Sequence, residues 1–191
     1  YLRQAAEPQQ DCSVTVIGCT FDDCHTTKVG NNNSYGCGLR STALVTKVCD
    51  AVHAMGKKVS ADVFPGPDSH AVKMVRQQWD EWPIDMVFPM NYNDFYLEPP
   101  AWVGRVTREE VKSMKGRAPI YSGLFICKDW QTKSDIKDPE GWGLLPSEME
   151  QAVVGSLRAG AKGLCLFSAD SMTEEHWAAL HRALQSYEAR Q

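Results

Sequence analysis

Long apolar runs and an excess of positive charge are both missing from this sequence. No apolar run among its 191 residues approaches the roughly 20 residues of a membrane-spanning helix, so no membrane span is expected. Lysine and arginine together number 20 and aspartate and glutamate 24, which gives a formal net charge of −4. Such a chain has no electrostatic reason to bind nucleic acid or an anionic membrane, and a neutral or cationic ligand fits it better.

Paired cysteine spacings are missing as well. The seven cysteines are an odd number scattered along the chain, which is not a disulfide framework. They are Cys12, Cys19, Cys24, Cys37, Cys49, Cys127 and Cys165. The first four, with His25, could be drawn into a zinc site, but no spacing among them matches a short paired-ligand motif. We therefore expect free buried thiols, no bound metal and no cofactor.

The composition is that of one globular domain. With 43% hydrophobic and 23% charged residues, the chain can bury a real core, and no linker or internal repeat divides it. We therefore expect a single domain over residues 1–191. The start, Tyr1-Leu2-Arg3, has neither a Met nor a signal-like apolar segment, which indicates a processed or trimmed beginning.

Short apolar runs alternate with helical periodicities along the chain. We predict strands at residues 14–21, 59–64, 84–92, 119–125 and 163–168, and helices at 39–55, 69–82, 101–114, 147–159 and 173–188. Long loops are expected at 24–38 and 128–146. Ser147 should open a capping box with Glu150, and Thr173 should cap the last helix.

This order predicts an α/β fold with a parallel sheet covered by helices. Five strand–helix units are too few for an eight-stranded barrel, and the chain lacks the glycine-rich loop of a nucleotide-binding sheet. We therefore predict the last five units of a partial (β/α) TIM-type barrel. Its two outer strands would have open edges, through which copies of the chain could self-associate.

The best clue to chemistry is Asp22-Asp23, at the end of the first predicted strand. Alternation puts Val16, Gly18, Thr20 and Asp22 on one face of that strand, which is small and then acidic. The inside of a barrel strand that ends in a site has this pattern, whereas a surface Asp-Asp turn would carry no chemistry.

The sequence resembles the family 10-like glycosyl hydrolases over nearly its whole length. Gly18-Cys19-Thr20-Phe21-Asp22-Asp23 is similar to the family's Asp-Gly-Ile-x-Phe-Asp-Asp strand, although Ile17 stands where the family has the first Asp. The stretches at 56–65, 88–92, 120–124 and 160–164 resemble its fifth to eighth strands, with Pro89-Met90-Asn91-Tyr92 the most specific. The first three strands of the family's barrel have no counterpart here.

The resemblance implies cleavage of glycosidic bonds in a bacterial cell-envelope glycan or another polysaccharide by paired carboxylates, in a protein of the envelope or a secreted one. We predict Asp22 as acid or nucleophile, with Asp62 as its partner because an inward carboxyl is costly unless it is functional. The expected substrate-binding residues lie at the ends of the strands or in the segments that follow them. They are Asp23, Asn91, Tyr92, Asp94, Tyr96, Asp129, Trp130 and Trp142.

Two other interpretations stay open. Thr20-Phe21-Asp22-Asp23 also resembles the first motif of metal-dependent polysaccharide deacetylases, although the chain has no His-x-x-x-His pair to complete a metal site. A partial barrel could also be a non-catalytic carbohydrate-binding or assembly module. Turnover of a glycan distinguishes an enzyme from a module, and dependence on a divalent metal distinguishes the deacetylase.

Overall fold

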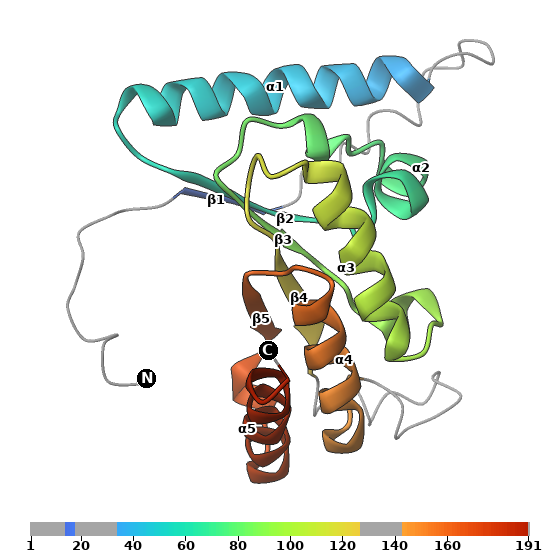
Figure 1. The fold of residues 1–191 in the computed structure, drawn as a ribbon. Helices are drawn as coiled ribbons and strands as arrows, with labels where there is room; N and C mark the ends of the chain where they lie inside the picture. The colour runs from blue at the N-terminus through green and yellow to red at the C-terminus, as the bar shows by residue number, and fades with distance from the viewer. Residues whose placement is uncertain (1–13, 18–33, 127–142, 191) are drawn as a thin grey trace.

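A computed structural model describes residues 14–17, 34–126 and 143–190 of the chain (Figure 1). Its strands are β1 (Val14–Ile17), β2 (Val59–Val63), β3 (Met86–Pro89), β4 (Tyr121–Phe125) and β5 (Gly163–Phe167). All pairings are parallel: β1, β2 and β3 form one sheet, and β4 pairs with β5. A single parallel bridge between Val87 and Ile120 links the two groups, so the spatial order of the strands is their order in the sequence.

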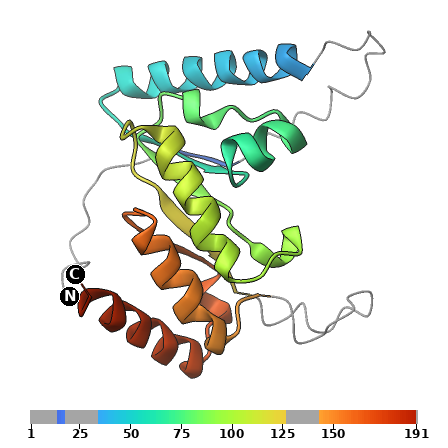
Figure 2. The same cartoon turned by 45° about the vertical axis from the view of Figure 1, so that its right-hand side comes forward.

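Helices follow the strands in the same order. The longer ones are α1 (Ser34–Ala54), α3 (Ala101–Met114), α4 (Pro146–Arg158) and α5 (Glu174–Glu188), and α2 (Val72–Val75) is a single turn. Figure 1 and Figure 2 show them descending the molecule from α1 at the top to α5 at the bottom. None of the helices in the described part of the chain is long and apolar enough to cross a membrane.

The strands pack their apolar faces under the helices. Val59, Ala61 and Val63 of β2 are completely buried in a cluster with residues of α1, as the alternation of that strand predicts. A second cluster joins β4 and β5 to α3, α4 and α5. The α/β class is therefore confirmed.

Helices α3 and α4 approach each other through two glycines. A Cβ atom on Gly104 would lie 2.9 Å from the Gly155 Cα, so only glycine fits the contact. This close approach brings the inner faces of both helices over β4.

The described elements differ from the predicted ones in three places. Helix α1 begins at Ser34, inside the loop predicted at 24–38, although Gly36 and Gly38 disfavour a helix. Val45 and Cys49 anchor the later turns of α1 in the core, and extending a helix that is already nucleated adds one hydrogen bond per residue. The strand predicted at 84–92 is shorter, since β3 ends at Pro89.

The helix predicted at 69–82 is broken. Residues Pro67–Ala71 form a π-helical turn, α2 ends where Arg76 takes a φ of 60°, and Trp79–Glu81 is a 3-10 turn. The cause lies at the end of β2, where the Phe64 N–H donates to Gln77 Oε1 at 2.9 Å and the Phe64 carbonyl accepts from Trp79 Nε1 at 2.9 Å. Pairing this buried backbone outweighs the continuation of the helix.

The two predicted helix caps had different outcomes. Thr173 caps α5, since its hydroxyl oxygen accepts from the His176 N–H at 3.3 Å. The box predicted at Ser147 is wrong: α4 begins at Pro146, and Glu148 Oε2 accepts from the Leu145 N–H at 2.9 Å. Proline at the first helical position fixes this earlier start.

Whether the strands form part of a barrel stays a prediction. In the part of the chain that the structure describes, β1 pairs only with β2 and β5 only with β4, so each has one unpaired edge.

We expect the 191-residue chain to self-associate through these edges, or to unfold at low denaturant, because exposed strand edges favour pairing with another copy. Light scattering combined with a urea titration measures both properties. A monodisperse, highly stable monomer would mean that the chain closes its own core and that the partial-barrel prediction is wrong.

Candidate functional site

Half of the predicted site residues lie in the described part of the chain. Asp22, Asp23, Asp129, Trp130 and Trp142 lie outside the described residues. Asp62, Asn91, Tyr92, Asp94 and Tyr96 are described, and they divide between the two faces of the sheet.

Asp62 lies on the face of β2 opposite the buried apolar cluster. It is half-buried, and within the described residues its carboxyl has no hydrogen-bond partner. Removal from water therefore raises its pKa above the ordinary value of an aspartate. In the register of the sheet, Asp62 is paired with Ile17 of β1 and Phe88 of β3.

Tyr92 and Cys165 lie near Asp62. Burial, and then the charges of Cys165 and Asp62, raise the pKa of the Tyr92 phenol. Burial, and then Asp62, raise the pKa of the Cys165 thiol. A carboxyl of β2, a thiol of β5 and a phenol that follows β3 are therefore within electrostatic range of one another.

Tyr92 also belongs to a set of four aromatic rings, which we call the aromatic shelf: Tyr92, Phe95, Phe125 and Phe167. The Tyr92 ring lies 5.3 Å from Phe125 and 5.8 Å from Phe167, with the latter stacked at 15°. Phe95 meets Phe125 edge-on at 5.1 Å. Phe95 and Phe167 are 46% and 56% exposed, so the shelf presents an apolar surface to solvent.

Asp94 connects two segments. Its Oδ2 accepts from the Gly143 N–H at 2.6 Å and its Oδ1 accepts from Asn93 Nδ2 at 3.1 Å. Burial raises its pKa against the lowering effect of the Gly143 bond. Both oxygens are engaged, so the geometry gives Asp94 a tethering role and does not support the sugar contact that we predicted.

Asn91 and Tyr96 lie on the helix side of the sheet. Asn91 is completely buried, and its amide nitrogen donates toward Glu110 Oε2 at 3.0 Å, Ser122 Oγ at 3.0 Å and Thr107 Oγ1 at 3.2 Å. Tyr96 packs 5.2 Å from Trp102 of α3, and burial raises its pKa. The burial of Asn91 leaves it no surface for a sugar, while the sugar contact of half-buried Tyr96 stays a prediction.

Glu110 is the functional candidate that sequence reasoning missed. It is 0% exposed on α3, and its Oε1 accepts from the Gly66 N–H at 3.1 Å. Ser122 links to Thr107 and to Ser156 of α4 at 3.1 Å each, which completes a buried polar network. The signal was available, since Thr107 and Glu110 are polar residues three apart on the same side of an amphipathic helix as buried Val103 and Val106.

Burial raises the pKa of Glu110 to about 7, against the lowering effect of its bonds to Asn91 and Gly66. The folded state thus holds this proton more tightly than the unfolded chain does. Its contribution to stability is complete below the ordinary pKa of 4.5 and is lost as the pH rises to about 7. The loss is on the order of 3 kcal/mol.

We therefore expect urea unfolding to show lower stability at pH 7.5 than at pH 5, and Glu110→Gln to flatten this dependence, because a neutral side chain has no proton to release. The raised carboxyls Asp62 and Asp94 titrate in both proteins and cancel in the difference. Glu150→Gln, a change at an exposed glutamate of α4, is the matched control and should keep the wild-type slope. Equal slopes in wild type and Glu110→Gln would contradict the prediction.

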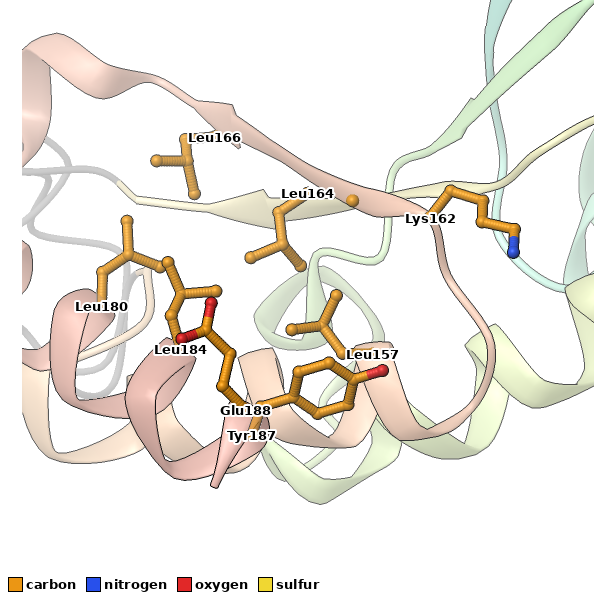
Figure 3. A pocket seen from close by; sticks show the side chains of 9 residues that line it. Leu157, Lys162, Leu164, Leu166, Leu180, Leu184, Tyr187 and Glu188 are labelled. Carbon is orange, nitrogen blue, oxygen red and sulfur yellow. The ribbon is translucent and has the colours of Figure 1, made fainter. Parts of the chain in front are cut away.

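An apolar groove of about 540 Å³ lies elsewhere, between β5 and helices α4 and α5 (Figure 3). Leu164 and Leu166 point into it from β5, and Leu180, Leu184 and Tyr187 line it from α5. These strand residues alternate with Cys165 and Phe167, so the groove is on the opposite face from the aromatic shelf. It is therefore separate from the candidate site.

The described residues offer no grouping of three or more His, Cys, Asp or Glu side chains that could hold a metal ion. The expectation of no metal and no cofactor stays a prediction.

Comparison with known proteins supports the fold. No protein-family model matches the chain, and no curated protein matches it. Among solved structures, the chain is similar to a class V chitinase from Pseudomonas fluorescens Pf-5, with a TM-score of 0.58, 15% identity and 76% of this chain covered. It is also similar to a chitinase from Chromobacterium violaceum ATCC 12472, with a TM-score of 0.53, 14% identity and 78% covered.

The match spans 62% of the length of each of these two chains. At such low identity the likeness shows the fold alone, an α/β fold similar to that of these two proteins. The more specific resemblance to family 10-like glycosyl hydrolases stays a prediction.

Proposed function

We propose that this chain carries the site of a glycoside hydrolase, with the substrate bound on the aromatic shelf beside Asp62. One observation carries the proposal: a carboxyl without a hydrogen-bond partner in the described residues, Asp62, lies beside Tyr92 and an exposed aromatic surface. Unpaired inward carboxyls are costly and gather at functional sites. The likeness of the fold to two chitinases supports the same reaction class.

Asp62 suits the role of general acid. Glycoside cleavage needs one carboxylic acid that protonates the leaving oxygen, and its pKa must be raised for it to keep the proton. Burial acts on Asp62 in this direction. The second carboxyl, nucleophile or base, we assign to Asp22, which follows Ile17, the residue paired with Asp62, by five positions.

The shelf supports a glycan as the substrate class. Pyranose rings have apolar C–H faces that stack on aromatic side chains, and a phenol hydroxyl such as that of Tyr92 can hydrogen-bond sugar hydroxyls. With the chitinase likeness, this favours an N-acetylated glycan, either chitin or the glycan strands of a bacterial cell envelope.

The test is incubation with chitin oligosaccharides, peptide-free peptidoglycan strands and other polysaccharides, with detection of new reducing ends. We expect Asp62→Asn and Asp22→Asn each to lower kcat by about 100- to 10,000-fold, the range for loss of a positioned acid or base. Circular dichroism checks that the fold is kept.

Asp170→Asn is the matched control, because Asp170 is an exposed carboxylate in the turn directly after β5. It should turn over at the wild-type rate. Wild-type turnover in folded Asp62→Asn would remove Asp62 from the mechanism, and glycan binding without any turnover by the wild type would favour a carbohydrate-binding module.

We also expect a chelator to change neither the fold nor the activity, since two carboxyls cleave glycosidic bonds without a cation. Thermal unfolding and turnover are measured with and without EDTA, followed by added Zn²⁺. Activity that is lost with EDTA and restored by the ion would instead favour the deacetylase, as would release of acetate without new reducing ends.

A further inference from the structure

Asn91 and Tyr92 are consecutive residues that serve opposite faces of the sheet. The last ladder bond of this segment runs from the Met90 N–H to the Val63 carbonyl at 2.8 Å. Beyond it the backbone closes on itself, with the Asn91 N–H donating to Pro89 O at 2.9 Å and the Tyr92 N–H to Met90 O at 2.8 Å. The sheet therefore does not hold Tyr92, and its direction depends on how Asn91 is anchored.

The anchor is a single glutamate side chain from the helix layer. Glu110 Oε2 accepts from Asn91 Nδ2 at 3.0 Å, and Glu110 Oε1 accepts from the Gly66 N–H at 3.1 Å. Gly66 follows β2 and Asn91 follows β3, so Glu110 joins the ends of the two strands that carry Asp62 and lead to Tyr92.

Packing alone does not explain a glutamate at this position. Glu110 is 0% exposed, and no lysine or arginine pairs with it within the described residues. A buried carboxyl without a cation is expensive, and an apolar side chain of similar size would often be at least as stable. The fold nevertheless gives this group two hydrogen bonds, one from the Gly66 backbone N–H and one from the Asn91 side-chain amide.

We propose that Glu110 is a positioning residue for the candidate site, holding Asn91 and Gly66 so that Tyr92 and Asp62 meet on the opposite face. The proposal rests on the proposed glycoside hydrolase function. Glu109 offers an internal comparison, because it binds the same loop through the N–H groups of Asp68 and Ser69, at 3.1 and 2.9 Å, without a bond to Asn91.

The test follows the Tyr92 ring directly. The full chain is labelled with ¹³C-tyrosine, and the Tyr92 ring signal is assigned as the one lost in Tyr92→Phe. We expect this signal to shift or split in Glu110→Ala, to shift less in Glu110→Gln, which keeps one of the two acceptors, and to stay unchanged in Glu109→Gln. An unchanged Tyr92 signal in folded Glu110→Ala would overturn the proposal. If Glu110→Ala does not fold, an unchanged Tyr92 signal in Glu110→Gln would overturn it instead.

Kinetics supply the second readout. Misplacement of a contact by about 1 Å costs roughly 100-fold in rate, so we expect kcat to fall about 10- to 100-fold in Glu110→Ala, and KM to rise because Tyr92 also contacts the sugar. An equal kcat in a folded variant counts against positioning. If the wild type cleaves no glycan, the proposed function fails, while the Tyr92 signal still decides whether Glu110 holds the anchor.

Discussion

The hydrogen bonds of one buried amide link the sheet to the helix layer. Asn91 donates to groups on α3 and β4, and its acceptor Glu110 reaches back to the loop after β2. Ser156 extends the same network to α4. Polar groups at the centre of a sheet–helix interface allow few alternative packings, because each must find its partner, so the network fixes the register of the strands against the helices.

This arrangement has an energetic cost. Asn91 Oδ1 and Gln77 Nε2 are buried without a partner in the described part of the chain. Each such atom forfeits on the order of 1–3 kcal/mol. Gln77 binds the end of β2 through the Phe64 N–H, and Asn91 lies just past the end of β3 and bonds to α3 and β4. Proteins retain such a loss of stability where the residues of a site must be held in fixed positions.

Sequence periodicity predicted most of the fold and only part of the site. The helix at 101–114 was predicted to the residue, because its apolar stripe and the glycine that follows it agree. The helix at 69–82 failed because its breaks come from Gln77 and Trp79 bonding the distant Phe64, which no local pattern encodes. Tertiary contacts of this kind override propensity.

The alternation of side chains along the strands predicts on which face of the sheet Asn91 and Tyr92 lie. Counting alternately along β3 from the buried Val87 puts Asn91 on the helix side and Tyr92 on the other. The same count along β4 and β5 puts Phe125, Cys165 and Phe167 beside Tyr92. The sequence prediction placed Asn91 and Tyr92 in one site because both are polar residues at a strand end. It did not take into account that consecutive residues point to opposite faces of the sheet. The Glu110 network, by contrast, joins residues from four elements, and only their packing reveals it.

The openness of the shelf has a consequence for the proposed chemistry. Phe95 and Phe167 are largely exposed, so water still reaches the surroundings of half-buried Asp62 in the free protein. A sugar stacked on these rings would displace that water. Because desolvation is what raises the pKa of Asp62, a bound substrate would raise it further and hold the proton where the leaving oxygen lies. Substrate binding on the aromatic shelf would then also keep the acid protonated. The shelf would in this way contribute to catalysis as well as to affinity.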